Sequence, residues 1–274
     1  MSATRICVLG AGNMGRALLS GLLRSGTRAE QLAVGESVPA VRAQVTRELG
    51  LAATADNEAA IADAGIVVLA VKPQEAAAVL RPLASALAAA RPLLISVCAG
   101  TRARELEAWC GSEVAVVRAM PNRPALLGAG ISGLYAPLKV NAAQRASAEG
   151  VLKAVGEVVW VPTEDMLDAV TALSGSGPAY FFLLAECMAE AGAQLGLEHQ
   201  VAQRLAAATL HGSGLLAHST GQDLAKLRAE VTSRGGTTDA ALRTLEAAGF
   251  KALIAKALSA AAARGRELAA ASRN

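Results

Sequence analysis

The stretch RICVLGAGNMG at residues 5–15 decides how the N-terminal half of the chain folds. It begins with a short apolar run, typical of a buried strand, and leucines at helical spacing follow it. Between them stands the spacing GxGxxG, in which Gly10 makes a tight turn, Gly12 lets a pyrophosphate approach the backbone and Gly15 lets the helix pack close on the strand. The stretch therefore predicts a dinucleotide-binding strand–turn–helix rather than an ordinary glycine-rich turn.

The alternation of strand and helix continues to about residue 161. Further strands are expected at 32–34, 51–53, 66–71, 93–97, 114–117 and 158–161. Helices are expected at 38–49, 57–63 and 74–89, then from a cap at Thr101 to Trp109, and Asn141–Gln144 reads as a capping box. This order predicts an α/β fold with a doubly wound parallel sheet of the Rossmann type.

The residues after the second expected strand bear on the choice of dinucleotide. Glu36 stands where an acidic side chain, about twenty positions beyond the glycines, usually binds the ribose 2′-OH and repels a 2′-phosphate. Ser37 beside it and Arg42 one helical turn on suit a phosphate instead. The sequence leaves NADH and NADPH open.

Three later strand ends carry residues suited to a flat nicotinamide ring. They read Ala-Val-Lys-Pro at 70–73, Ala-Gly at 99–100 and Met-Pro-Asn at 120–122. Because open α/β sheets bind ligands outside the carboxyl ends of their strands, these turns should meet at one edge. Each alone reads as an ordinary loop between strand and helix, but the three together favour a nicotinamide pocket.

Beyond Pro162 the pattern is helical throughout. A hydroxyl-rich loop at 174–178 is expected before helices at 179–195, 199–217, 222–230 and 238–248. These helices carry apolar residues on more than one face, which suggests burial beyond what one subunit provides. We expect a dinucleotide-binding domain at 1–162 and an all-α domain at 163–274 that forms a homodimer.

The segment VTSRGGTTD at residues 231–239 precedes the last of these helices. Two adjacent glycines free the backbone for a tight turn, and a helix N-terminus presents N–H groups and the positive end of its dipole to an anion. Its hydroxyl groups add further donors and acceptors. Taken alone, the segment is equally well read as a small anion site or as an ordinary helix cap.

Charge and composition exclude several classes of function. A net charge of +3 without a block of Lys or Arg gives no sign of a nucleic-acid or membrane surface. The four cysteines are scattered, and the three histidines have no metal-ligand spacing, so no metal site is expected. No apolar run is long enough to cross a bilayer and no targeting segment is evident, so a cytoplasmic location is expected.

Five motifs together resemble the pyrroline-5-carboxylate reductase family. They are GAGNMG at 10–15, AVKP at 70–73, RAMPN at 118–122, SGSGPAY at 174–180 and VTSRGGTT at 231–238. The resemblance implies reduction of 1-pyrroline-5-carboxylate to L-proline by NADPH or NADH. It also implies a Rossmann domain followed by a helical dimerisation domain, with dimers often assembled into a decamer.

The resemblance also implies roles for individual residues. Thr238 is the catalytic candidate, near the imine nitrogen. The expected substrate contacts are Ser233, Gly235, Gly236, Thr237, Thr238 and Ser176. The expected cofactor contacts are Gly10, Gly12, Asn13, Met14, Gly15, Glu36, Ser37, Asn57, Ala70, Val71, Lys72, Pro73, Ala99, Gly100, Met120, Pro121 and Asn122.

Three positions depart from the family pattern. Arg234 stands where the family usually has proline, and Arg123 where it usually has threonine. Glu36 is the more consequential departure, because the family commonly prefers NADPH and an acidic residue here favours NADH. Two other functions compete with the reductase: a β-hydroxyacid dehydrogenase, which would want a lysine that helix 179–195 lacks, and a non-catalytic dinucleotide-binding regulator.

Overall fold

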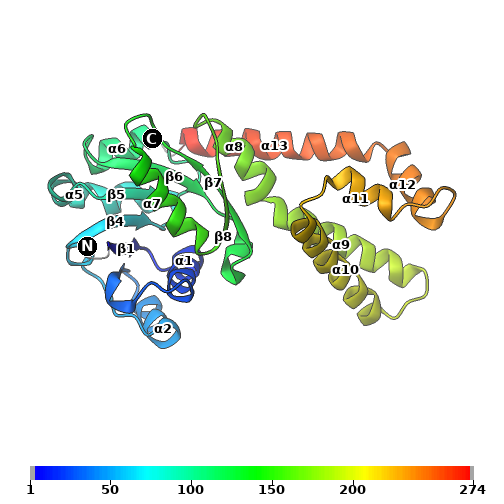
Figure 1. Cartoon of the computed structure of the whole chain (residues 1–274), viewed down its shortest axis with the longest axis horizontal. Coiled ribbons are helices and arrows are strands. Elements are labelled where there is room, and N and C mark those ends of the chain that lie inside the picture. The colour runs from blue at the N-terminus through cyan, green and yellow to red at the C-terminus, as the bar shows by residue number, and fades with distance from the viewer. Residues whose placement is uncertain (1–3, 272–274) are drawn as a thin grey trace. The chain divides into compact units, whose positions relative to one another are not determined.

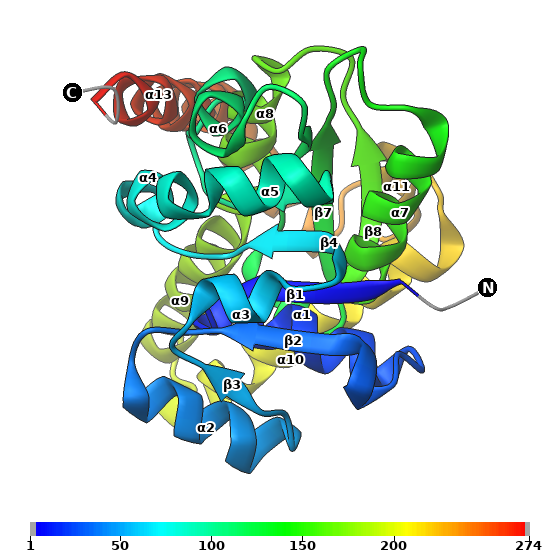
Figure 2. The same cartoon turned by 90° about the vertical axis from the view of Figure 1, so that its left-hand side faces the viewer.

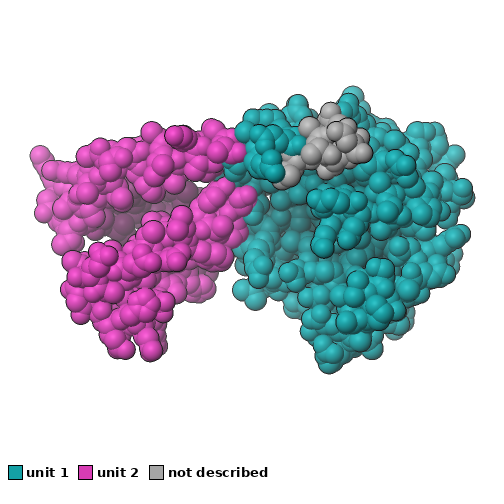
Figure 3. Space-filling view, turned by 180° about the vertical axis from the view of Figure 1, so that it is seen from behind, with its two compact units in different colours: residues 1–175, 261–274 teal, residues 176–260 magenta. Residues whose placement is uncertain are grey.

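The computed structural model describes residues 4–271, and the chain divides into two compact units (Figure 3). Unit 1 comprises residues 1–175 and 261–274, and unit 2 comprises residues 176–260. The expected domain border at 162/163 lies thirteen residues before the first border between these units. The domain border at 162/163 therefore remains a prediction.

Unit 1 is built on one eight-stranded sheet (Figures 1 and 2). The strands are β1 Arg5–Leu9, β2 Leu32–Gly35, β3 Ala53–Thr54, β4 Ala64–Leu69, β5 Leu93–Ser96, β6 Ala115–Met120, β7 Gly130–Tyr135 and β8 Gly156–Trp160. Their order is β3-β2-β1-β4-β5-β6-β7-β8, and every neighbouring pair is parallel except β6 with β7. The predicted α/β class and mostly parallel sheet are confirmed, whereas β7 is a strand that the sequence did not predict.

Helices cover both faces of this sheet. One face packs against α1 Asn13–Arg24, α2 Pro39–Leu49 and α7 Ala142–Lys153; the other packs against α3 Asn57–Ile61, α4 Ala76–Leu80, α5 Ala84–Ala90 and α6 Ala103–Cys110. In β1, Ile6 and Val8 belong to the first core and Cys7 and Leu9 to the second. This two-sided burial explains why the central strands are apolar at nearly every position, with Arg5, Ser96 and Arg118 as polar exceptions.

Two helix predictions in unit 1 need correction. The single helix expected at 74–89 is divided into short segments, because Pro82 lacks an N–H and lies in a 3₁₀ turn, Arg81–Leu83, between α4 and α5. The cap of α6 is Arg102, whose N–H donates to Glu105, and not Thr101. The capping box at Asn141 and Gln144 is confirmed.

The end of unit 1 is helical where a loop was expected. Helix α8, Met166–Val170, continues into a π-helical turn, Thr171–Gly175, so the loop predicted at 174–178 is wrong. A π-helical turn inserts an extra residue into the helix and is found frequently at functional sites. Two 3₁₀ turns beside the strands, Ala29–Gln31 and Pro73–Glu75, and a third at Arg123–Leu127 complete the unit.

Unit 2 consists of helices alone among its described residues. They are α9 Gly177–Gln194, α10 His199–Thr220, α11 Leu224–Glu230, α12 Thr237–Ala247 and the first part of α13 Phe250–Ala271. Pro178 lies in the first turn of α9, as predicted. The long helices α9 and α10 pack against each other through alanines. Among the described residues, no helix is both long and apolar enough to cross a membrane.

Candidate active site

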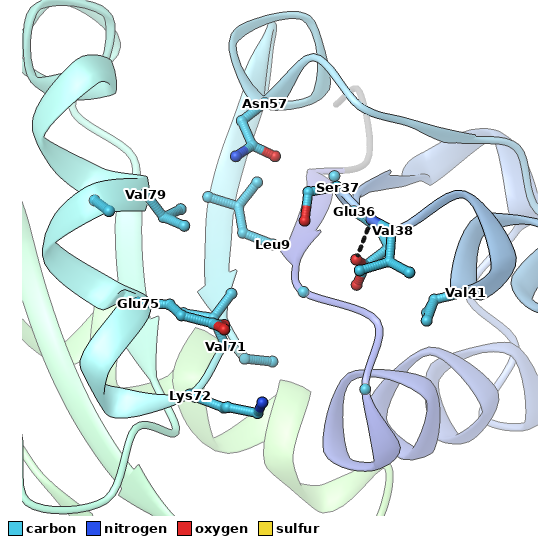
Figure 4. A pocket seen from close by; sticks show the side chains of 15 residues that line it. Leu9, Glu36, Ser37, Val38, Val41, Asn57, Val71, Lys72, Glu75 and Val79 are labelled. Carbon is cyan, nitrogen blue, oxygen red and sulfur yellow. Dashed lines mark hydrogen bonds between the residues drawn. The ribbon is translucent and has the colours of Figure 1, made fainter.

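A cavity of about 510 Å³ lies at the carboxyl ends of β1, β2 and β4 (Figure 4). In the sheet, β2 lies on one side of β1 and β4 lies on the other. The cavity therefore lies where the order of the strands reverses direction. Open α/β sheets bind their ligands at such a switch point. Eight of the predicted cofactor contacts line the cavity: Gly10, Gly12, Glu36, Ser37, Asn57, Ala70, Val71 and Lys72.

The glycine turn has the shape that a dinucleotide requires. Gly10 has a φ of +90°, and a Cβ there would lie 2.8 Å from the carbonyl oxygen of Ala70. A Cβ on Gly15 would collide with the carbonyl oxygen of Gly10, whereas one on Gly12 would meet nothing within 4 Å. Gly12 thus leaves open space beside the first turn of α1, where a pyrophosphate can approach backbone N–H groups. The residues present fit a dinucleotide.

Glu36 closes the cavity at the end of β2. Its Oε2 accepts the N–H of Ala11 at 2.8 Å, and its Oε1 accepts the N–H of Val38 at 2.8 Å. Arg42 donates from Nη1 to the carbonyl oxygens of Glu36 and Ser37, both at 2.8 Å. The carboxylate therefore ties the glycine turn to the turn that follows β2, a link across 25 residues of sequence.

Several cavity residues were missed by the sequence analysis. They are Leu9, Gly35, Val38, Val41, Glu75, Ala78 and Val79. A Cβ on Gly35 would lie 2.5 Å from Oδ1 of Asn57, so this glycine makes room for the asparagine. Glu75, Ala78 and Val79 follow Lys72 at helical spacing, a signal that points them to one face.

The remaining predicted cofactor residues lie outside the cavity lining. They are Asn13, Met14, Gly15, Pro73, Ala99, Gly100, Met120, Pro121 and Asn122. Next to two of these turns, the thiol of Cys98 donates to the carbonyl oxygen of Val71 at 3.3 Å and so joins the ends of β4 and β5. Burial raises the pKa of this thiol to about 11, so it serves as a packed donor and not as a nucleophile.

Asn122 holds the π-helical turn beside β6. Its Nδ2 donates to the carbonyl oxygen of Ser174 at 3.2 Å, and its Oδ1 accepts the N–H of Ile131 at 3.0 Å. A Cβ on Gly175 would lie 2.8 Å from Cε of Met120, so this glycine lets the methionine pack against the turn. Met120 and Asn122 therefore connect the sheet edge with Ser174 and Gly175.

A group of buried ion pairs, also missed from the sequence, fastens α8 to the sheet. Arg118 on β6 pairs with Glu164 at 2.9 Å, and Arg102 pairs with Asp168 at 2.8 Å. Oε1 of Glu164 also accepts the N–H of Ala103 at 2.6 Å. Burial lowers the pKa of Arg118, and the carboxylate of Glu164 opposes that shift.

In unit 2, the segment 233–239 forms a tight turn into α12. Gly235 has a φ of +74°, and its N–H donates to Oδ2 of Asp239 at 2.8 Å. The N–H of Gly236 donates to the carbonyl oxygen of Ser233 at 3.0 Å, and a Cβ on Gly236 would lie 2.5 Å from the Ser233 hydroxyl. The backbone N–H groups of Thr237 and Thr238, in the first turn of α12, have no acceptor in the part of the chain that the structure describes.

Within residues 4–271, no three His, Cys, Asp or Glu side chains come together as a metal site would require. The polar groups that line the cavity at the glycine turn are backbone N–H groups, the Ser37 hydroxyl, the Asn57 amide, the Lys72 ammonium group and the Glu36 carboxylate.

The sheet, its switch-point cavity and its glycine turn define the class of nicotinamide-dinucleotide oxidoreductases. The profile described as "NADP oxidoreductase coenzyme F420-dependent" matches residues 5–100, and the profile described as "Pyrroline-5-carboxylate reductase dimerisation" matches residues 164–268. A pyrroline-5-carboxylate reductase of Pseudomonas aeruginosa is 46% identical over 269 residues, covering 98% of each chain. The chain belongs to the pyrroline-5-carboxylate reductase family.

Solved structures of the family have the same fold. The pyrroline-5-carboxylate reductase of Coxiella burnetii superimposes with a TM-score of 0.93 at 38% identity, covering 97% of this chain and 98% of that one. The Plasmodium falciparum pyrroline carboxylate reductase with NADP bound superimposes with a TM-score of 0.83 at 29% identity, covering 98% and 99%. The fold and family expected from the five motifs are therefore confirmed.

Proposed function

We propose that this protein reduces the C=N bond of 1-pyrroline-5-carboxylate to give L-proline, with NADPH or NADH as the hydride donor. The observation that carries the proposal is the open glycine turn at the switch-point cavity, in a chain whose relatives along nearly its full length are pyrroline-5-carboxylate reductases. A protonated imine is already electrophilic, so the protein's main contribution is to position two reactants.

Unit 1 is proposed to hold the cofactor. Gly12 and the first turn of α1, Asn13 and Met14 included, receive the pyrophosphate, while Glu36, Ser37 and Asn57 lie at the adenosine end. The nicotinamide supplies a hydride when it is bound. Its proposed walls are Ala70, Val71, Lys72, Pro73, Ala99, Gly100, Met120, Pro121 and Asn122.

The turn at 233–238 is proposed to hold the substrate carboxylate. The unpaired N–H groups of Thr237 and Thr238 and the dipole of α12 favour an anion there, and the Ser233 hydroxyl adds a donor. Gly235 and Gly236 keep side chains out of the turn, and Ser176 is proposed as a further contact from the SGSG motif. Asp239 accepts the N–H of Gly235, which fixes the shape of the turn.

Two further features belong to the same proposal. We propose a homodimer formed through the helices of unit 2 and the assembly of such dimers into a decamer. A cytoplasmic location also stays a prediction.

The reaction is tested by following absorbance at 340 nm with each cofactor. It should fall on addition of 1-pyrroline-5-carboxylate and stay constant with 3-oxoacids, which a β-hydroxyacid dehydrogenase would reduce. Loss of absorbance with the 3-oxoacids alone would assign the chain to that other activity, and no loss with any substrate would leave a dinucleotide-binding protein without this reaction.

Thr238→Ala tests the residue proposed nearest the imine nitrogen. As a neutral hydroxyl, Thr238 can donate one hydrogen bond or relay a proton from water, so its loss should lower turnover about ten- to a hundredfold. Thr244→Ala is the matched control, because Thr244 lies on the same helix and its hydroxyl donates to the carbonyl oxygen of Ala240. Equal turnover in the two variants would reject a role for Thr238.

A further inference from the structure

The carboxylate of Glu36 is fixed in one position before any cofactor binds. Each of its two oxygens accepts one backbone N–H, from Ala11 and from Val38, at 2.8 Å. With one donor on each oxygen, the carboxylate is fixed in orientation. The residue is 9% exposed, and its remaining surface contributes to the cavity lining.

The arginines near this end of the cavity are engaged elsewhere. Nη1 of Arg42 donates to the carbonyl oxygens of Glu36 and Ser37. Nη1 and Nη2 of Arg16 donate to Ala11 and Asn13, and its Nε lies 3.7 Å from Glu48. A 2′-phosphate beside Glu36 would thus meet a fixed negative charge, and the two arginines there already donate to other groups of the protein, whereas a 2′-hydroxyl can donate to that charge. Lys72, a cation that lines the same cavity, follows β4 and not β2.

We infer that Glu36 makes this protein prefer NADH to NADPH, and that the same carboxylate holds the glycine turn in its binding shape. The inference rests on the proposed function, since it assumes that the cavity holds a nicotinamide dinucleotide. This double role of Glu36 has a consequence that charge repulsion of the 2′-phosphate alone would not have. Replacing Glu36 removes the discrimination and also frees the N–H groups of Ala11 and Val38, so both cofactors bind less well.

The test is the dissociation constant of each cofactor, measured by calorimetry without substrate. NADH should bind the unaltered protein at least about tenfold more tightly than NADPH, and the gap should narrow as salt screens the repulsion. Equal affinities, or tighter NADPH, would overturn the inference and leave the proposed function intact. Binding of neither cofactor would overturn both.

Glu36→Gln separates charge from shape. The amide oxygen accepts only one of the two N–H groups, and the amide nitrogen cannot accept the other. Affinity for NADH should fall by more than tenfold, and the ratio between the two cofactors should drop to within about threefold. An unchanged ratio in this variant would assign the preference to other residues.

Two further variants complete the test. Glu30→Gln, in the exposed turn before β2, removes a charge of the same sign outside the cavity lining and leaves the contacts of Arg16 and Arg42 intact, so it should leave the ratio unchanged. Arg42→Ala should weaken both cofactors alike, because its guanidinium braces the backbone of the turn. A selective loss of NADPH binding in Arg42→Ala would show that the arginine receives a 2′-phosphate, which contradicts the inference.

Discussion

The two compact units bury their apolar residues in opposite ways. In unit 1 the sheet carries a core on each face, and leucines such as Leu18 and Leu80 are inaccessible to solvent. The hydrophobic cluster of unit 2 contains only three buried residues, Ala189, Ala202 and Ala206. Its large apolar side chains are exposed in the single chain, among them Phe181, Phe182, Leu183, Leu184 and Met188 on α9.

This difference indicates what each unit needs in order to be stable. Unit 1 covers both faces of its sheet with its own helices, although some apolar side chains such as Leu127 and Leu173 stay exposed. Unit 2 has helices whose apolar faces need another surface, and the profile that matches residues 164–268 is that of a dimerisation domain. We therefore expect changes inside unit 1 to act on its own stability and ligand, and changes on unit 2 to act through association.

The largest effect is expected from glycines of unit 1. Gly15→Ala places a Cβ against the carbonyl oxygen of Gly10, so the turn or α1 must shift. Stability should fall by about 2–3 kcal/mol and cofactor affinity by more than about a hundredfold. Thermal melting and calorimetric titration measure the two quantities.

Gly12→Ala is the matched control within the same turn. A Cβ there meets nothing within 4 Å of protein, so the melting temperature should stay unchanged while cofactor affinity still falls. If Gly12→Ala binds the cofactor normally, the open space at Gly12 is not where the pyrophosphate lies. If both variants have the same melting temperature, the close packing of Gly15 against the carbonyl oxygen of Gly10 does not contribute to stability.

The same contrast explains how much could be predicted from sequence. β1, the glycine turn and the start of α1 are local, and every residue of that stretch agrees with the others in spacing and chemistry. β7 was missed because Gly130, Ser132 and Gly133 interrupt its apolar pattern. Its position depends on long-range contacts, such as the one between Gly133 and Val170, which no local pattern reveals.

The candidate site shows the same limit. The acidic residue at the end of β2 was recognisable from its spacing, but its bonds to Ala11 and Val38 were not, because Ala11 lies 25 residues away. Asn122 was expected at the cofactor, and the structure shows its amide bound to Ser174 and Ile131. The types of residue at the site could be predicted from the sequence, whereas the hydrogen-bond partners that the tertiary fold gives them could not.

The next effect should appear on the exposed face of α9. Leu184→Glu puts a charge on a residue that is 44% exposed in the single chain and stands among other apolar side chains. Burying that charge at a dimer contact should weaken association about a hundredfold, since it has no partner there. Sedimentation at micromolar concentration measures the change.

Leu138→Glu is the control in unit 1. Leu138 is 102% exposed, on the turn after β7, and it is an isolated apolar residue that needs no partner. This variant should sediment like the unaltered protein. A dimer that survives Leu184→Glu, or one that Leu138→Glu dissociates, would contradict the assignment of the interface to unit 2.

The smallest effect concerns the reactivity of the cysteine thiols. It measures how well each unit buries its cysteines and requires no substitution. Burial raises the pKa of Cys7 to about 12 and that of Cys98 and Cys110 to about 11, so at pH 8 about one in a thousand of the latter is the reactive thiolate. Cys187 on α9 is exposed in the single chain.

Iodoacetamide should therefore modify only Cys187 in the native protein and all four cysteines in denaturant, and the intact mass of the protein measures the number of modified cysteines. Dilution below the dimer dissociation constant should speed that single modification if α9 is covered by a second copy. Modification of Cys98 or Cys110 under native conditions would mean that the core of unit 1 opens as readily as the surface of unit 2.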